Sequence, residues 1–141
     1  MRYFSLFIFI TFLIIGCKSA SINQKTNKKR EGLWIEYYEV DSSKYKSVGK
    51  HKNDDPIKKW RYYLNGKIIK REKYKGAICK TTTFFENGKI QSKGHTKTTT
   101  DSIATHWFYD GVWNFYNEKG KPTIIKKYSN GELISEVEQN Q

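Results

Sequence analysis

Between Glu31 and Glu138, aromatic and β-branched residues occur in short clusters that alternate with polar positions. Glycines follow these clusters at short, recurrent spacings. Clusters of this kind, bounded by turn residues, are typical of β-strands. No long stretch has the 3.6-residue apolar period and the capping residues of a helix. The pattern therefore predicts an all-β fold.

Three Asn-Gly pairs mark expected turns, because Asn and Gly tolerate the positive φ that a type I′ turn requires at both central residues. They are Asn65-Gly66, Asn87-Gly88 and Asn130-Gly131. The predicted hairpins join residues 58–64 with 67–75, 78–86 with 89–96, and 122–129 with 132–138. Two further strands are expected near 32–40 and 106–117. Residues 97–105 are predicted to be a loop or a ragged edge strand.

A W-x-x-Y frame recurs along the chain, at residues 34–37, 60–63 and 113–116, with a degenerate copy at 82–85. The turn sequence of residues 63–67 returns 22 residues later at 85–89. Such periods indicate a repeat architecture. Neither face of the expected strands is cleanly apolar, which favours an open sheet with two partly wet faces. The prediction is an elongated antiparallel sheet of successive β-hairpins.

These repeats resemble the MORN-repeat variant of bacterial proteins of the YwqK-type antitoxin family. Its pattern is roughly G-x-W-x-x-Y-x-x-G-K, followed by a strand and Y-x-x-G. Residues 32–37, 60–76 and 111–131 match it in part, and the resemblance covers roughly residues 31–136. It implies MORN-like hairpins in one elongated sheet and, by association, an immunity or antitoxin role.

The first 16 residues differ from the rest of the chain. Arg2 gives a positive start, and residues 3–15 are apolar except for Ser5 and Thr11. This run is shorter than the about 20 residues that span a bilayer. A charged start, a short apolar run and a small residue before the cut are typical of an export signal. The alternative is a short membrane anchor that is never cut.

The end of this run, Ile14-Ile15-Gly16-Cys17, resembles the lipobox of bacterial lipoproteins. The resemblance implies cleavage before Cys17 and lipidation of its thiol, usually with acylation of the new N-terminus. Two or three acyl chains, at about 0.8 kcal/mol per buried methylene, hold a protein firmly at a membrane. With Cys17 lipidated, Cys79 has no disulfide partner, and we expect it to be a buried, unreactive thiol.

The chain is thus predicted to divide into a lipoprotein signal peptide at 1–16, the lipidated cysteine with a flexible tether at 17–30, and a repeat domain at 31–138. Residues 18–30 are polar and lack aromatic side chains, so they bury too little apolar surface to fold. No acidic residue occurs before Glu31, which favours a periplasm-facing protein in a bacterial cell envelope.

Basic residues outnumber acidic ones along the whole chain. There are 26 Lys and Arg against 14 Asp and Glu, and only Arg2 lies in the expected signal, so the mature chain carries a net charge of +11. Such a charge favours anionic partners, among them lipid head groups and acidic glycans. Nucleic acid is not expected as the partner of an exported protein.

No catalytic, cofactor-binding or metal-binding group stands out in the sequence. His51, His95 and His106 lack the spacing of metal ligands. There is no G-x-S-x-G elbow and no glycine-rich phosphate loop. We therefore expect a protein that is not an enzyme and that needs no cofactor.

Aromatic and basic side chains interleave at one candidate binding surface. Its residues are Trp60, Arg61, Tyr62, Tyr63, Trp113 and Tyr116, with cations of the 67–75 segment beside them. Rings stack on sugars and bases, while cations pair with phosphate or carboxylate. The alternative is that the W-x-x-Y frame is the packing core of the repeat.

These observations predict a membrane-anchored lipoprotein whose non-enzymatic repeat domain acts as a binding or scaffold module in the cell envelope. The alternatives are an immunity or antitoxin protein, and a binder of anionic glycans or lipid head groups.

Overall fold

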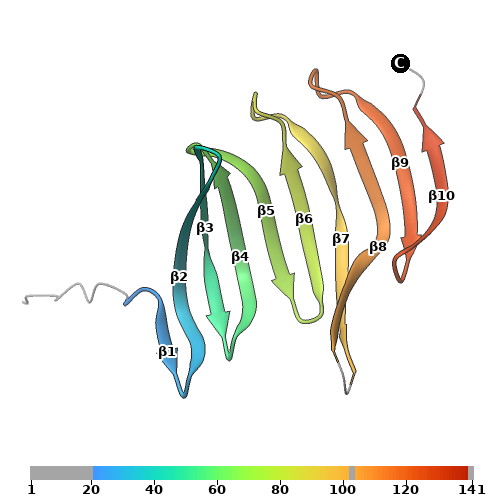
Figure 1. Cartoon of the computed structure of the whole chain (residues 1–141). Coiled ribbons are helices and arrows are strands. Elements are labelled where there is room, and N and C mark those ends of the chain that lie inside the picture. Colours follow the sequence, from blue (N-terminus) through green and yellow to red (C-terminus); the bar gives the residue numbers. More distant parts are fainter. Residues whose placement is uncertain (1–20, 102–103, 140–141) are drawn as a thin grey trace, which may run out of the picture.

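The computed structural model describes residues 21–101 and 104–139. They form one open antiparallel sheet in which ten strands follow each other in chain order, as Figure 1 shows. The strands are β1 (Gln24–Thr26), β2 (Lys29–Val40), β3 (Ser43–Lys52), β4 (Asp55–Leu64), β5 (Lys67–Lys75), β6 (Ile78–Phe84), β7 (Ile90–Thr100), β8 (Thr105–Tyr116), β9 (Pro122–Ser129) and β10 (Glu132–Glu138). The predicted all-β sheet of successive hairpins is therefore confirmed.

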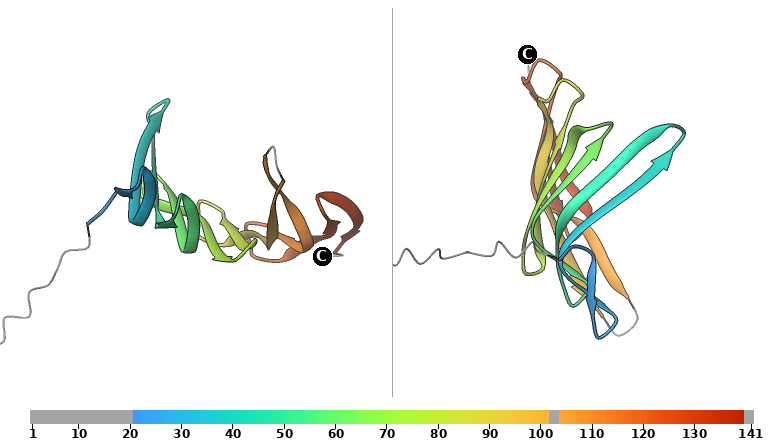
Figure 2. Two further views of the ribbon diagram at one scale, coloured as in Figure 1. Left: turned by 90° about the horizontal axis from the view of Figure 1, so that it is seen from below. Right: turned by 90° about the vertical axis from the view of Figure 1, so that its left-hand side faces the viewer.

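The sheet is a single twisted layer, seen from its edge in Figure 2. In both views of that figure, the far ends of the β2–β3 and β7–β8 hairpins turn towards the same side of the sheet. In the part of the chain that the structure describes, no helix is long and apolar enough to cross a membrane. The expected signal peptide and Cys17 lie outside the described residues.

The sheet begins before the predicted domain boundary at Glu31. Residues 24–26 form β1 and pair with 29–31 at the start of β2. Asn23 extends this edge, because its amide side chain receives a hydrogen bond from Ile35 N at 2.8 Å and donates one to Ile35 O at 2.9 Å. Residues 24–26 and 29–30, which the sequence analysis placed in the tether, are therefore paired strands in this structure, and backbone hydrogen bonds join a segment with almost no apolar side chains.

The predicted hairpins are present, with one correction to the turns. Asn65 and Gly66 both have positive φ, as do Asn130 and Gly131. The Asn87-Gly88 turn is longer than predicted: Phe85 N donates to Lys89 O at 2.8 Å, and only Gly88 of the pair has a positive φ. Residues 117–121 form the same closed loop, with Asn117 N donating to Lys121 O at 2.9 Å.

Strand β3 was not predicted, because neither of its turns contains glycine. Asp41 and Ser42 precede it with φ of 47° and 65°, and Asn53 and Asp54 follow it with φ of 53° and 72°. Short polar side chains tolerate this left-handed conformation. Residues 97–100 are also more regular than predicted, since β7 runs to Thr100, which pairs with Thr105 of β8.

Two tryptophans form the centre of the core. Trp60 on β4 and Trp113 on β8 are 4% and 3% exposed. Each indole N–H donates to a carbonyl of the preceding strand, from Trp60 to Lys50 at 3.1 Å and from Trp113 to His95 at 2.8 Å. Each indole also stacks on the ring two residues later. β3–β4 and β7–β8 are therefore two copies of one packing unit.

Small side chains lie beneath these rings. Gly49 on β3 and Gly94 on β7 are buried, and a Cβ added at either position would overlap the indole atoms of Trp60 or Trp113. Their neighbours on the same side of the sheet are buried as well: Ser47, His51, Ser92 and Thr96. A single-layer sheet thus builds its core by laying wide rings over small residues.

The G-x-W spacing corresponds to a bulge. Register shifts between Val48 and Lys50, so that residues 58–60 of β4 lie opposite Gly49 alone. Residues 111–113 of β8 lie opposite Gly94 in the same way. The first residue of each bulge is left-handed, with φ of 61° at Lys58 and 71° at Gly111. Bulges of this kind re-aim the following side chain, here the Trp.

Candidate functional site

The predicted binding surface divides between the two faces of the sheet. Trp60, Tyr62 and Trp113 lie on one face, which we call the aromatic face, where both Trp rings are buried and pack the sheet. The opposite face, which we call the basic face, carries Arg61 together with Tyr63 and Tyr116. The six residues therefore do not form one continuous surface.

Cations on the aromatic face are paired with carboxylates. Lys70 Nζ lies 2.9 Å from Glu72 Oε1, and Lys126 Nζ lies 3.0 Å from Glu136 Oε2. The hydrogen bond to Glu136 raises the pKa of Lys126. Charge on this face is therefore largely neutralised within the protein.

Glu72 also organises two phenols. Its Oε2 accepts hydrogen bonds from Tyr62 Oη at 2.6 Å and from Tyr74 Oη at 2.9 Å, and its side chain is buried. Burial raises the pKa of both phenols, and the Glu72 charge raises them further. This cluster holds neutral phenols against a buried carboxylate, which serves packing and leaves no free acid or base.

The basic face carries two rows of cations in register across neighbouring strands. Lys59 lies opposite Lys73, which lies opposite Lys80; we call this the lysine row. Arg61 lies opposite Arg71, Arg71 lies opposite Thr82, and Thr82 lies opposite Lys93. We call the three cations Arg61, Arg71 and Lys93 the arginine row. All six cations are exposed. Like charges directly opposite each other are unfavourable, so this arrangement costs the folded protein stability.

Carboxylates are few near these cations, and Asp110 of β8 lies beyond the end of the lysine row, opposite His95. The five strands from β3 to β7 contain only two acidic residues, Asp55 on β4 and Glu72 on β5. Glu72 belongs to the aromatic face, opposite Trp60 and Thr81. Within the described chain none of the six row cations forms an ion pair, whereas Lys70 and Lys126 on the other face do.

Aromatic rings orient two of these cations without neutralising them. Arg71 Cζ lies 4.8 Å from the centre of the Phe84 ring, and Lys93 Nζ lies 5.3 Å from that of Tyr116. Such cation–π contacts restrain a side chain but leave its net charge in place. These two side chains are therefore restrained and remain cationic.

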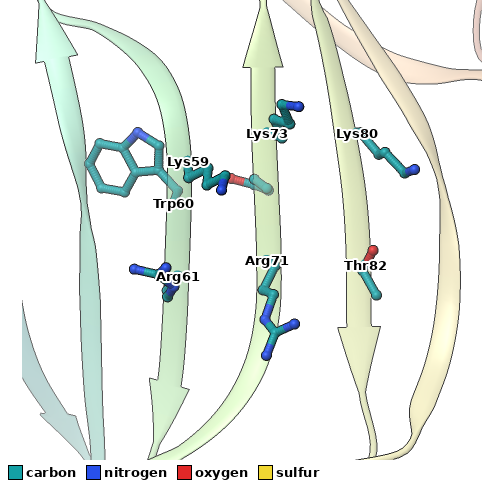
Figure 3. A pocket seen from close by; sticks show the side chains of 8 residues that line it. Lys59, Trp60, Arg61, Arg71, Lys73, Lys80 and Thr82 are labelled. Atoms are coloured by element: carbon teal, nitrogen blue, oxygen red, sulfur yellow. The ribbon is translucent and has the colours of Figure 1, made fainter.

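A shallow groove of about 430 Å³ runs between the two rows. Figure 3 shows its side chains, which come from the three adjacent strands β4, β5 and β6. They are Lys59, Trp60, Arg61, Arg71, Glu72, Lys73, Lys80 and Thr82. Two of them, Trp60 and Glu72, make their side-chain contacts on the aromatic face, with Tyr62. A second hollow of about 500 Å³ shares Lys59, Arg61 and Lys73 with it and adds the apolar side chains of Leu33 and Val48.

Other chemically capable side chains are engaged in packing or lie apart. Cys79 is a free, buried thiol, as predicted, and burial raises its pKa. His51 is wedged edge-on between Trp34 and Trp60, at 5.7 and 4.8 Å between ring centres. His106 contacts Asp101 at 2.9 Å on the exposed rim. Among the described residues, no three His, Cys, Asp or Glu side chains gather where they could hold a metal ion.

Sequence reasoning singled out Arg61 and the cations of residues 67–75 but did not find Lys59, Lys80 or Lys93. Alternation along each strand places every second residue on one face, which is a signal for the two rows. Alternation alone could not predict which residues of β4 and β5 lie opposite each other, because the register between these strands shifts between Tyr62 and Tyr63.

Comparison of the chain with protein-family models, with curated protein sequences and with solved structures returns no match.

Proposed function

We propose that this protein is a non-enzymatic binding module of the bacterial cell envelope, which holds an anionic partner on the basic face of its sheet. One observation carries the proposal: six exposed cations stand in register across four strands, and among the described residues none of the six forms an ion pair. A folded chain tolerates such repulsion at a cost, and an external anion removes that cost on binding.

Lipidation at Cys17 would place this face close to a membrane. Between Cys17 and the first residue of β1, Gln24, an extended chain reaches at most about 25 Å. The link is shorter than the 17–30 tether expected from the sequence, because β1 and the start of β2 belong to the sheet. A short link of this kind favours ligands that lie at or near the membrane surface.

The lipid anchor is tested by replacing its attachment site. The wild-type chain should incorporate a palmitate analogue in a bacterial host, and the Cys17→Ala variant should not. Equal labelling of both chains would contradict the lipoprotein assignment, without bearing on the basic face.

The binding role is tested with the full chain in neutral detergent. Probes are vesicles of phosphatidylcholine alone, the same vesicles with phosphatidylglycerol added, and immobilised polygalacturonate. We expect stronger binding to at least one anionic probe than to the neutral vesicles, and a loss as salt rises, since screening weakens contacts between exposed charges. Binding that is equal for neutral and anionic probes, or insensitive to salt, would refute the proposal.

The immunity or antitoxin role remains a prediction from the resemblance alone. Two observations would favour this role: a toxin gene next to the gene for this protein, and toxicity when the gene for this protein is deleted.

A further inference from the structure

We propose that the groove between the lysine row and the arginine row takes a linear acidic polysaccharide, laid across the strands. The inference rests on the proposed function and names the class of anion for the same face. It starts from the direction of the two rows, which run across the strands, the lysine row from β4 to β6 and the arginine row from β4 to β7.

The two rows form a track with a regular charge spacing. Neighbouring strands lie about 4.8 Å apart, and positions two residues apart along a strand are separated by about 7 Å. Lys59, Lys73 and Lys80 therefore stand about one strand spacing apart on one side of the groove. Arg61 and Arg71 stand at the same interval on the other side. A polymer with one anion per repeating unit can meet a cation at each step.

The chemistry of the lining suits carboxylates on sugars. Each guanidinium has a planar fork of donors that matches a carboxylate or phosphate in two parallel hydrogen bonds. Phe84 restrains the Arg71 side chain, so that less freedom is lost when an anion binds. Thr82 adds a hydroxyl to the same groove, at the strand position between Arg71 and Lys93. A hydroxyl can pair with the hydroxyl groups that a sugar carries beside its carboxylate.

The extent of the rows argues against a single small anion. The lysine row crosses two strand intervals, from β4 to β6, and the arginine row crosses three, from β4 to β7, or about 14 Å. One phosphate or carboxylate cannot bridge that length. A flat lipid surface would contact exposed cations wherever they stand on the face, including Lys50, which does not line this groove. A linear polymer, by contrast, can place successive anions against the successive cations of the two rows.

The test measures affinity against chain length with oligogalacturonates of one to eight sugars, using the full chain in neutral detergent. We expect no measurable binding of the single sugar. The affinity should rise with each added sugar until the oligomer spans the rows, and longer oligomers should bind no more tightly. Methyl-esterified oligomers of the same length, which lack the charge, should not bind.

Two triple variants of equal charge separate the groove from the net charge. Lys59→Gln/Lys73→Gln/Lys80→Gln removes the lysine row and should weaken binding of the longest oligomer by about tenfold or more. Lys25→Gln/Lys119→Gln/Lys121→Gln removes three exposed lysines away from the groove and should leave the affinity within about twofold. All six substitutions are at exposed positions, where folding tolerates the change.

The outcomes distinguish this inference from the proposed function. Equal weakening by both triple variants, or no dependence on chain length, would overturn the groove as the site. Salt-sensitive binding to phosphatidylglycerol vesicles without any binding of the oligomers would overturn the glycan and leave the proposed function standing. Binding to neither class of probe would overturn both.

Discussion

The indole ring of Trp60 lies directly on the α-carbon of Gly49, on the neighbouring strand, with no room for a Cβ between them. Trp113 and Gly94 repeat this contact two hairpins later. Gly49→Ala should therefore destabilise the protein by about 2–3 kcal/mol, as other overpacked cores do. Urea unfolding followed by tryptophan fluorescence measures the change.

A double-mutant cycle controls this prediction. In a Trp60→Ala background the space above Gly49 is empty, so the cost of Gly49→Ala should largely disappear. A cost that is the same in both backgrounds would show that the glycine is needed for its backbone and not for contact with the ring.

Lys58 occupies a backbone position that glycine fills in the other two repeats. Its φ is 61°, against 73° at Gly32 and 71° at Gly111. A left-handed conformation costs a residue with a Cβ about 1–2 kcal/mol. Glycine avoids this cost, but its greater freedom in the unfolded chain offsets part of the stability gained. Lys58→Gly should stabilise the protein by about 0.5–1 kcal/mol. Lys58→Ala, which removes the charge but keeps the Cβ, is the matched control and should give no gain.

Tyr62 and Tyr74 share the buried carboxylate of Glu72. Tyr62→Phe leaves Glu72 with one partner fewer and should cost about 1.5–3 kcal/mol, the usual range for a hydrogen bond to a charged group. Thermal unfolding at neutral pH measures the loss. In a Glu72→Met background, the same substitution should cost much less; an unchanged cost would mean that the hydroxyl contributes through some other contact.

The same two phenols predict alkaline instability. Their pKa values are raised in the folded protein above the ordinary value of 10.0, chiefly by burial. Above that pH the unfolded chain releases protons that the folded chain retains, so rising pH favours unfolding. Phenolate absorbance of these two residues should therefore appear only together with unfolding. Full ionisation in a chain that stays folded would contradict the buried cluster.

Cys79 should be slow to react in the folded protein. Its thiol is buried, and burial raises its pKa, so little nucleophilic thiolate is present near neutral pH. A Cys17→Ala variant leaves Cys79 as the single thiol for measurement with a chromogenic disulfide reagent. We expect rapid reaction in urea and reaction at least about tenfold slower in buffer. Equal rates would place the thiol at the surface.

The order of the elements could be read from the sequence where the turns contain Asn-Gly. Such turns place the strands of residues 67–75 and 132–138 correctly. Strand β3 was missed because Asp41-Ser42 and Asn53-Asp54 reach the same left-handed conformation without glycine. The short β1 was missed because backbone hydrogen bonds order it, and backbone groups are the same for every sequence.

The aromatic clusters and the excess of Lys and Arg were evident from composition and spacing alone. They established an open sheet with wide rings as its packing material and a basic surface. The sequence also indicated that Cys79 would be a buried thiol. These features depend on local chemistry, which each residue carries with it.

Only the tertiary structure decided which charges meet. If the pairing of β4 with β5 ran without a shift from the Asn65-Gly66 turn, Lys59 would lie opposite Glu72 and its charge would be neutralised. The irregularity between Tyr62 and Tyr63 moves the register by one residue, so that Lys59 lies opposite Lys73 and Trp60 opposite Glu72. A shift of one residue turns every side chain of a strand to the other face. One bulge therefore separates a buried carboxylate cluster on one face from two unpaired rows of cations on the other.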